Sequence, residues 1–490
     1  MARLVVVSNR VSAPKSGTRA GGLEVAVMAA LKRNPGIWFG WSGRLSTNVL
    51  ATRTIEGDQV SFVLTDLPRE AYNEFYYGFA NRVLWPILHY RLDLAEFSRQ
   101  DLSGYIQINE HFADELDELL KPDDVVWVHD YHFLLLAKAL RERGHRNKIG
   151  FFLHTPFPPV EIITGLPHHE RIISALCHYD LVGFQTETDA ANFARYVESE
   201  IRYPGDRKSG YDTGERTICI SDFPVGVEME NFNKTARRAM KSSFVRGVLS
   251  SLSGRAMIIG VDRLDYSKGI ENRLAAFEHF LADYPEWRDN VTYLQITPKS
   301  RSEIPEYMQM ERNVSSTVGR VNGKYGEASW TPIRYVNRAH TRTALAGLYR
   351  ASRAALVTPL RDGMNLVAKE YVAAQDADDP GVLILSRFAG AAVECKPALL
   401  VNPYDTEAVA AAIYRALTMP LDERRARHNA LYGILTKNDI NEWPGRFLTA
   451  LTGAPTLDAG PHAGPDAGAL ESAPGPIVLP KRRAAASRAN

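Results

Sequence analysis

The stretch LVTPLRDGMNLVAKEY at residues 356–371 combines the residue types that a sugar- or phosphate-binding loop needs. The apolar run Ala354 to Val357 predicts a buried strand, the polar residues after it turn the chain, and a helix is expected from about Met364. Open α/β sheets bind ligands at such junctions, because the first helical amides are unpaired and electropositive. Glu370, about two turns into the helix, could bind a ribose diol. Alternatively, Asp362 caps an ordinary helix and Glu370 is a solvated charge.

Basic residues stand at two further strand ends. In VDRLDYSKG at 261–269, Arg263 follows a predicted strand and Lys268 precedes a helix, so both cations lie beside a helix amino terminus, which suits a diphosphate. Alternatively, Arg263 pairs with a neighbouring aspartate at the surface. Lys299 and Arg301 follow another strand and add positive charge there.

The elements that must position these residues alternate between strand-like and helix-like segments, which predicts an α/β protein with parallel sheets. A chain of 490 residues is too long for one ordinary core. A polar, strand-free stretch divides it into an N-terminal domain, 1–240, and a C-terminal domain, 241–452, with a ligand cleft between them. Residues 453–490 are rich in Ala, Gly and Pro and predict a disordered tail. The predicted strands are 4–8, 37–42, 60–64, 125–128, 149–153, 181–185, 218–224, 256–261, 291–296, 333–336, 354–357, 382–386 and 399–401.

The first half offers weaker signals. Its loop at 10–22 contains three glycines between a strand and a helix, but it matches neither GxxxxGK[ST] nor a well-placed GxGxxG. The aromatic block at 75–85 is typical of a core, although Tyr and Trp also stack on sugars. His129 and His132 end a strand without a nearby cysteine pair, so we interpret them as hydrogen-bonded structure rather than metal ligands.

Composition excludes several classes of protein. With 58 basic and 57 acidic residues, the chain has no general surface for nucleic acid or anionic membranes. Cys177, Cys219 and Cys395 are far apart, which argues against a disulfide framework or a zinc site and favours a reducing compartment. No stretch has the length of a membrane span, and the first apolar run is too short for a signal peptide. We therefore expect a cytoplasmic protein without nucleic-acid or membrane partners.

Several long motifs then resemble one known family in the right order. The sequence resembles the trehalose-6-phosphate synthase family from about Arg3 to Leu451, and the tail lies outside this resemblance. That family consists of retaining glycosyltransferases with the GT-B architecture, in which two Rossmann-like domains face a central cleft. The motifs are VSNRV at 7–11, GGL at 21–23, GWSG at 40–43, NRVLWPILHYR at 81–91, WVHDYH at 127–132, FLHTPFP at 152–158, GFQT at 183–186, DRLDYSKG at 262–269 and TPLRDGMNLVAKEY at 358–371.

The resemblance implies transfer of glucose from a nucleotide-diphosphate glucose to glucose 6-phosphate, with retention, by a front-face substitution. It implies no metal or other cofactor, and a homo-oligomer, a dimer or a tetramer. For catalysis it implies Asp130, His154, Arg263, Lys268 and Asp362. For acceptor binding it implies Arg10, Gly21, Gly22, Trp41, Tyr76, Trp85, Asp130 and Arg301. For donor binding it implies Arg263, Lys268, His340, Asp362, Gly363, Met364, Asn365, Leu366, Val367, Ala368, Lys369 and Glu370.

Two departures and two alternatives accompany this resemblance. Arg338-Ala339-His340 stands where relatives often carry an aromatic residue, so the nucleotide base could be uracil or a purine. Tyr77 stands where many relatives have Asn. The alternatives are a pseudo-glycosyltransferase that couples cyclitols and a non-catalytic regulatory subunit. The intact cations at both ends of the expected cleft count against the regulatory subunit.

Overall fold

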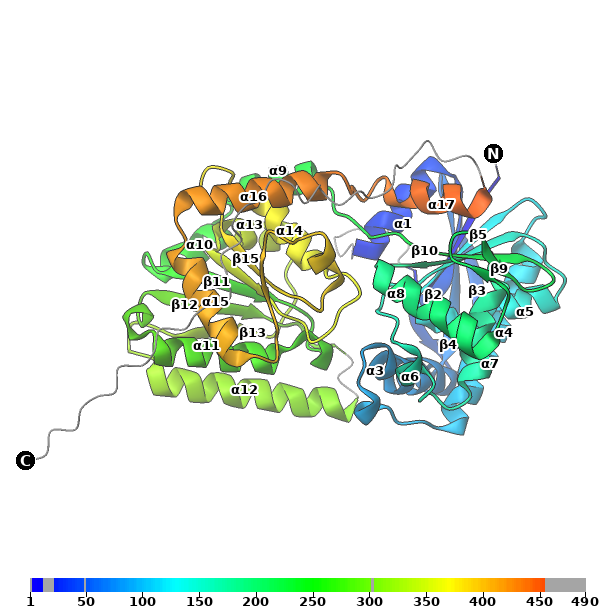
Figure 1. Cartoon of the computed structure of the whole chain (residues 1–490), viewed down its shortest axis with the longest axis horizontal. Helices are drawn as coiled ribbons and strands as arrows, with labels where there is room; N and C mark the ends of the chain where they lie inside the picture. The colour runs from blue at the N-terminus through cyan, green and yellow to red at the C-terminus, as the bar shows by residue number, and fades with distance from the viewer. Residues whose placement is uncertain (1, 12–21, 48–49, 301–303, 454–490) are drawn as a thin grey trace, which may run out of the picture.

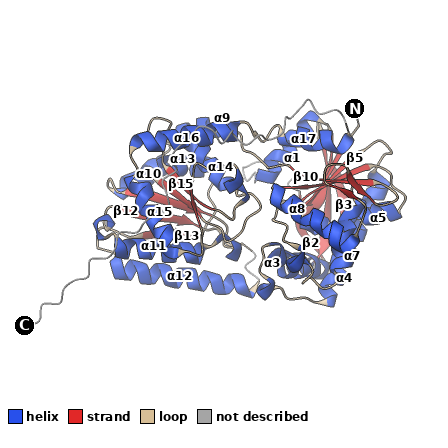
Figure 2. Ribbon diagram, in the orientation of Figure 1, coloured by secondary structure: helices blue, strands red, loops and turns tan. Residues whose placement is uncertain are grey.

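The computed structural model describes residues 2–11, 22–47, 50–300 and 304–453. Two halves lie side by side, each built on its own β-sheet (Figure 1). Helices cover both faces of each sheet (Figure 2). The predicted α/β architecture with two Rossmann-like sheets is confirmed. Within the described residues, no helix combines the length and apolar character that a membrane crossing requires.

The first sheet has the strand order β3-β4-β2-β1-β5-β6-β7-β10-β9-β8. Its central strands run parallel, while β3 and the β8–β9 hairpin add antiparallel edges that the sequence did not indicate. The strands are β1 (Leu4–Arg10), β2 (Gly36–Ser46), β3 (Ala51–Ile55), β4 (Val60–Pro68), β5 (Val125–His129), β6 (Lys148–Phe152), β7 (Leu181–Phe184), β8 (Gly205–Asp206), β9 (Gly210–Asp212) and β10 (Thr217–Asp222).

The second sheet is entirely parallel, in the order β13-β12-β11-β14-β15-β16. Its strands coincide with the predicted ones, because each is a short, mostly apolar run, and the four inner strands are almost entirely buried. They are β11 (Ala256–Val261), β12 (Val291–Ile296), β13 (Ile333–Val336), β14 (Ala354–Val357), β15 (Val382–Ser386) and β16 (Leu399–Val401).

The helices fill the connections between these strands. The α-helices are α1 (Gly22–Arg33), α2 (Arg69–Tyr72), α3 (Trp85–Leu88), α4 (Arg99–Leu119), α5 (Leu136–Glu142), α6 (Val160–Ile163), α7 (His169–Ile173), α8 (Glu187–Tyr196), α9 (Met229–Ala239), α10 (Ser243–Leu252), α11 (Ile270–Asp283), α12 (Pro305–Tyr325), α13 (Arg342–Ala351), α14 (Leu366–Ala374), α15 (Thr406–Thr418), α16 (Leu421–Thr436) and α17 (Trp443–Thr452). A π-helix, η1 (Asn73–Leu84), connects α2 to α3.

Each sheet separates two hydrophobic cores. Val5 and Val7 of β1 face the core beneath α4 and η1, whereas Leu4 and Val6 face the opposite core. Successive side chains of a strand point to opposite faces, so an unbroken apolar run is what a sheet covered on both sides requires. The sheets are therefore rigid supports for the loops at their strand ends.

The hydrophobic cores divide the chain at other points than the predicted boundary near residue 240. Met229 and Phe232 of α9 lie before that boundary but pack in the second half. Trp443 and Phe447 of α17 lie after it but pack against the first sheet. Figure 1 shows α17 beside α1. The chain thus crosses between the halves twice, from β10 to α9 and from α16 to α17.

Candidate functional site

Predicted site residues gather where each sheet changes its strand order. β1 lies between β2 and β5 in the first sheet, and β11 lies between β12 and β14 in the second. Arg10 ends β1 and Asp130 directly follows β5, while Arg263 and Asp362 come after β11 and β14. Neighbouring loops diverge at these positions, which is why open α/β sheets bind ligands there.

The loop at residues 358–365 is organised around one carboxylate. The Asp362 Oδ2 atom lies 2.5 Å from the Lys268 Nζ atom, and the Asn365 amide donates to the same oxygen at 3.0 Å. The Asn365 side chain also accepts from the backbone N–H of Ala368 and caps α14. Asn365, rather than Asp362, is therefore the cap of α14. The Asp362 carboxylate pairs instead with Lys268, one of the cations that we expected to bind a diphosphate.

A buried guanidinium, that of Arg273, lies behind this pair. Its Nη1 atom is 2.9 Å from the Asp262 carboxylate, and its Nη2 and Nε atoms donate to the Lys268 carbonyl and the Thr358 hydroxyl, at 3.1 and 3.0 Å. Burial raises the pKa of the Asp262 carboxyl, and the charge of Arg273 opposes that rise. Arg273 thus ties together the strand ends that carry Lys268 and the 358–365 loop.

Arg263 does not pair with a neighbouring aspartate. Asp262 pairs with Arg273, and the Asp265 carboxylate accepts from the backbone N–H of Ser267 at 3.0 Å. The Arg263 side chain is exposed and forms no ion pair with another described residue. Its guanidinium carbon lies 5.8 Å from the centroid of the Trp85 ring in the first half. The charge of Arg263 therefore faces the space between the halves.

Two adjacent residues of α14 have opposite surroundings. The Glu370 carboxylate is partly exposed, and its Oε1 atom lies 3.4 Å from the Arg342 Nε atom. Burial raises the pKa of the Glu370 carboxyl, while Arg342 opposes that rise. Lys369 is fully buried, with its ammonium group donating to the Val225 carbonyl and the Glu394 carboxylate. Glu370 is accessible to a ligand, whereas Lys369 fastens α14 to its surroundings.

His340 lies in the loop between β13 and α13. Its ring centroid is 5.2 Å from that of Phe244 in α10, and both side chains are partly exposed. Burial lowers the pKa of the His340 imidazole, and the nearby Arg338 lowers it further. The neutral ring and Phe244 together form an apolar surface on which a base could stack.

On the first half, Arg10 lies over the aromatic ring of Trp41. The guanidinium carbon is 5.8 Å from the ring centroid. Gly43 has a φ of 83°, and a Cβ atom there would lie 2.9 Å from the Arg10 Nη2 atom, so glycine is required for both reasons. Arg10 is exposed and forms no ion pair with another residue that the structure describes. Its charge is accessible to an anion.

The aromatic block at 75–85 lies mostly in the π-helix η1, and it divides into core and surface. Phe75 and Phe79 are fully buried, whereas Tyr76 is half-buried and stacks on the His132 ring at 5.8 Å with an interplanar angle of 8°. π-Helical turns are rare and occur often at functional sites. Both interpretations of the aromatic block, core packing and a surface for stacking, are thus met by different members of the block.

Asp130 adopts a left-handed conformation, with a φ of 74°, directly after β5. Its Oδ1 atom accepts from the backbone N–H of His154 at 3.3 Å, and the His154 Nε2 atom lies 3.2 Å from the His129 Nδ1 atom. Burial lowers the pKa of His154 to about 3 and that of His129 well below its ordinary value. Both rings are therefore neutral at physiological pH.

The two halves touch at this point. A Cβ atom on Gly363 would lie 2.1 Å from the carbonyl oxygen of His154, so only glycine permits this approach. A continuous series of ring contacts also leads from the Arg10 end of the first half to Trp85, which meets Arg263. We call this series the aromatic wall; its rings are Trp41, Tyr76, His132, Tyr131 and Trp85. Its counterpart, the cationic wall, consists of Arg263, Lys268, Arg273 and Asp362.

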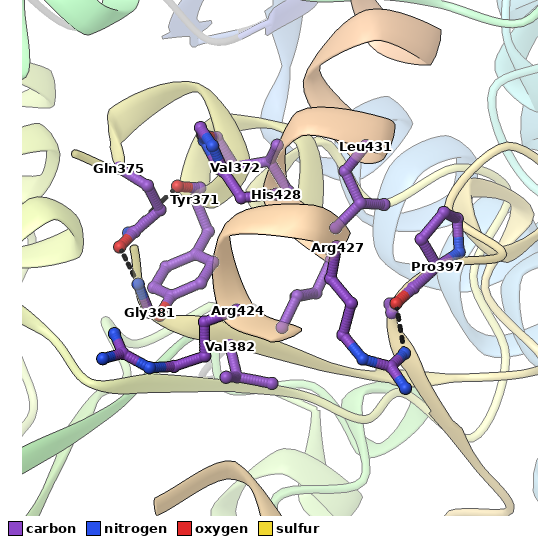
Figure 3. A pocket seen from close by; sticks show the side chains of 12 residues that line it. Tyr371, Val372, Gln375, Gly381, Val382, Pro397, Arg424, Arg427, His428 and Leu431 are labelled. Atoms are coloured by element: carbon purple, nitrogen blue, oxygen red, sulfur yellow. Dashed lines mark hydrogen bonds between the residues drawn. The ribbon is translucent and has the colours of Figure 1, made fainter. Parts of the chain in front are cut away.

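Two cavities of the described structure differ in volume and in the residues that line them. A hollow of about 830 Å³ lies beside Tyr77 and is lined by residues of the first half and by Ile304 and Pro305 of the second. In contrast, the enclosed cavity between α14 and α16, shown in Figure 3, has a volume of about 10 Å³, which suits a single water molecule. Its lining includes Arg424 and His428. The hollow beside Tyr77 has the size of a substrate site, but none of the described residues predicted to bind donor or acceptor lines it.

Comparisons with known proteins decide the family. The model of glycosyltransferase family 20 matches residues 5–453. The chain belongs to glycosyltransferase family 20.

Family 20 relatives match over nearly their whole length. Trehalose-6-phosphate synthase of Sinorhizobium fredii is 51% identical over 460 residues, which cover 92% of this chain and 98% of that protein. The crystal structure of a UDP-forming α,α-trehalose-phosphate synthase from Burkholderia xenovorans in complex with glucose-6-phosphate has a TM-score of 0.88, with 43% identity, and covers 92% and 100% of the two chains. An E. coli structure bound with UDP-2-fluoro glucose has the same TM-score and identity and covers 92% and 99%. The predicted GT-B architecture is thereby confirmed.

In this family 20 chain, five of the predicted residues meet where the two halves touch. Asp130, His154 and Trp85 meet Arg263 and Gly363 there. Other predicted residues lie in or directly after the 358–365 loop: Met364 and Ala368 are buried, and Leu366 and Val367 are partly buried. Gly22 begins α1 in the first half. Lys369 does not face this space. Gly21 and Arg301 lie outside the described residues.

The sequence reasoning missed four residues with a structural part in this site. Arg273 carries no signal, because a basic residue within a helix is usually solvated. His89, Tyr90 and Arg361 lie inside the motifs that carry the family resemblance, and that location was the available signal.

Proposed function

We propose that this family 20 chain is an α,α-trehalose-6-phosphate synthase that transfers glucose from UDP-glucose to glucose 6-phosphate with retention. The activities and ligands of the relatives support this proposal, since they match the chain almost end to end. The observation that carries it is the meeting of Trp85 with Arg263, because it brings the acceptor-binding and donor-binding sets of residues to one space.

In this proposal, the cationic wall binds the donor. Arg263 and Lys268 neutralise the diphosphate, whose charge grows as the glycosidic bond breaks. Lys268 has three N–H donors, so it can keep its contact with Asp362 while it binds a phosphate oxygen. Glu370 binds the ribose hydroxyls, and His340 with Phe244 offers the stacking surface for the base. The backbone amides at the start of α14 bind the donor through their partial positive charge.

The aromatic wall binds the acceptor. Arg10 holds the phosphate of glucose 6-phosphate, with Arg301 as a second cation, and the sugar ring packs against Tyr76 and Trp85. Asp130 accepts from sugar hydroxyls, which its fixed position between β5 and His154 allows. His154, next to Asp130, is neutral. The Asp130 carboxylate therefore accepts a hydrogen bond from a sugar hydroxyl without competition from a positively charged imidazole.

The transfer then proceeds on one face of the donor sugar. The acceptor hydroxyl attacks from the side on which the diphosphate leaves, and a leaving phosphate oxygen takes the hydroxyl proton. The new C–O bond joins the donor anomeric carbon to the oxygen on the acceptor anomeric carbon, while the bond from the donor anomeric carbon to the phosphate oxygen breaks and the nucleoside diphosphate is released. No carboxylate serves as a nucleophile, in contrast to the two-carboxylate glycosidases. The cations of the cationic wall supply the charge that a divalent metal would otherwise supply.

The proposal is tested by incubating the purified protein with glucose 6-phosphate and UDP-, ADP- or GDP-glucose, and by identifying the product with NMR. We expect an α,α-1,1-linked disaccharide phosphate, with UDP-glucose as the preferred donor. Product formed only from cyclitol substrates would support the pseudo-glycosyltransferase instead. Binding of both substrates without product would support the regulatory subunit.

We also propose a cytoplasmic homo-oligomer, a dimer or tetramer. The three cysteines are free thiols, two of them buried, which suits a reducing compartment. Exposed apolar residues gather near the edge strand β16, where Val393, Leu400 and Tyr404 are 56%, 43% and 58% exposed. Such a patch favours association between subunits. Light scattering of the purified protein measures the oligomeric state, and a monomer would contradict this part of the proposal.

A further inference from the structure

Three consecutive residues after α3 each meet the second half. His89 is buried, donates through Nδ1 to the Trp85 carbonyl at 2.8 Å, and lies within electrostatic range of Lys268. Tyr90 stacks on Arg361, and Arg91 lies 5.8 Å from the ring centroid of Tyr266. This segment directly follows α3, which begins at Trp85 of the aromatic wall, so it links that wall to the second half.

The contact between Tyr90 and Arg361 is the closest of the cation–ring contacts that the described halves share. The guanidinium carbon of Arg361 lies 3.8 Å from the Tyr90 centroid, against 5.8 Å for the contacts that Arg91 and Arg263 make. The Phe388 ring, in the second half, lies 5.3 Å from the same guanidinium carbon. A planar guanidinium that contacts two aromatic rings is restricted in orientation.

Tyr90 is itself held in place. Its φ of 64° lies in the left-handed region, which a bulky residue rarely adopts, and its backbone N–H donates to the Ile87 carbonyl at 2.9 Å. Its hydroxyl donates to the Phe157 carbonyl at 3.4 Å, and the Phe157 N–H donates to the Asp189 carboxylate at 2.9 Å. Surrounding hydrogen bonds therefore maintain an unfavourable backbone conformation that points this ring at Arg361.

Arg361 precedes Asp362, the carboxylate that holds Lys268. The backbone on both sides is also fixed, because the Leu360 N–H donates to the Ser267 carbonyl at 2.7 Å and the Asp362 N–H donates to the Phe388 carbonyl at 3.2 Å. With the backbone fixed on both sides, the Arg361 side chain is the group of this segment that joins the loop of Asp362 to Tyr90 of the first half.

We propose that Tyr90 is a positioning residue for donor binding and transfer: its stack on Arg361 fixes the 358–365 loop, and with it Asp362 and Lys268, against the aromatic wall. This inference rests on the proposed function, since it assigns Tyr90 to the reaction proposed above. Tyr90 touches no reacting atom in this proposal and acts only through Arg361.

The test compares Tyr90→Leu, which keeps an apolar side chain without a π face, with Tyr90→Phe, which keeps the face. We expect Tyr90→Leu to lower kcat/KM for UDP-glucose about tenfold and to weaken UDP binding in calorimetry by a similar factor. Tyr90→Phe should stay within about threefold of the wild type, since a 3.4 Å hydrogen bond is all that it loses. Tyr284→Leu, which removes the Tyr284–Tyr414 stack inside the second half, is the matched control and should leave both constants unchanged.

A double-mutant cycle with Arg361→Lys separates positioning from a general loss of structure. If Tyr90 acts through Arg361, the two effects on UDP affinity are not additive, and the double variant is about as impaired as Tyr90→Leu alone. Equal effects of Tyr90→Leu and Tyr90→Phe, additive effects in the cycle, or a lowered melting temperature with unchanged UDP affinity would each overturn the inference. UDP binding does not require turnover, so an inactive wild type would refute the proposed function while this series still decides the role of Tyr90.

Discussion

The two walls of the site hold their charged groups in different ways. On the cationic wall, Lys268 and Arg273 are buried or nearly so, and each is paired with a carboxylate. Beside the aromatic wall, Arg10 is exposed and is supported by the Trp41 ring rather than by an anion. The nearby Asp130 carboxylate is held by a backbone N–H and stands beside a neutral histidine.

This difference teaches what each wall must do for its ligand. A diphosphate that leaves with growing charge needs cations whose positions are fixed before the reaction, because reorganisation during bond cleavage would cost free energy. A phosphate that is only bound, and does not react, can be held by a flexible surface guanidinium. We therefore expect Lys268, in its buried pair, to act in catalysis and the exposed Arg10 to act in recognition. The predictions below separate these two roles.

The largest effect is expected for Lys268→Ala. Removing this fixed cation should lower kcat about 100- to 1,000-fold, the usual range for loss of one preorganised group facing transition-state charge. The measurement is kcat at saturating UDP-glucose and glucose 6-phosphate. Lys324→Ala removes an exposed lysine that pairs with Glu278 on the surface, and it should leave kcat unchanged. Turnover of Lys268→Ala within threefold of the wild type would contradict the assigned role.

Arg10→Ala should have a smaller effect, and on a different constant. We expect a 10- to 100-fold higher KM for glucose 6-phosphate, roughly the worth of one charge-assisted hydrogen bond, with kcat little changed. Free glucose as acceptor should be affected much less, because it has no phosphate. Arg33→Ala, an exposed arginine that pairs with Glu442, is the matched control. Equal losses for both acceptors would show that Arg10 does not recognise the phosphate.

How far the sequence predicted these walls depends on the range of the interactions. Runs such as Val125 to Val128 predicted strands well, because burial on both sides is a local pattern, and the polar residues that follow them fell at the site. The π-helix carries no local pattern of its own, since Phe75, Phe79 and Val83 have the spacing of an α-helix.

Contacts between distant segments were beyond any pattern in the sequence. The apolar stripe of α17 predicts a buried face but does not say that it packs on the first sheet. The burial of Arg273 and the stack of Tyr90 on Arg361 likewise depend on how the two halves meet. The family resemblance gave the predicted site residues but not the residues that support them, such as Arg273 and Tyr90. These supporting contacts are what distinguishes the two walls.

We expect the pH dependence of the free energy of unfolding to come mainly from buried histidines beside the aromatic wall, such as His154. Burial lowers the pKa of His154 from 6.5 to about 3, so the unfolded chain binds more protons than the folded one between these values. Stability is therefore lost as the pH falls below 6.5, by about 1.4 kcal/mol per pH unit for one such group. His154→Gln should reduce the slope by this amount in urea unfolding measured between pH 7.5 and 4.5, while the buried His129 and His89, whose pKa values are also lowered, keep part of it in place. His340→Gln, which changes a partly exposed ring, should leave most of the slope in place; an unchanged slope in His154→Gln would mean that His154 is not neutral in the fold.

The smallest effect is expected for removal of divalent metal. If Arg263 and Lys268 supply the positive charge where the diphosphate leaves, as proposed, EDTA should change the kcat of the wild type by less than about twofold. The same reasoning predicts a different result for Lys268→Ala, in which Mg²⁺ bound to the donor diphosphate could replace the missing charge and raise kcat several-fold. The comparison requires kcat of both proteins with EDTA and with added Mg²⁺. A wild type that loses most of its activity in EDTA would show that the cationic wall does not suffice, and that its buried ion pairs serve to position a metal-bound donor instead.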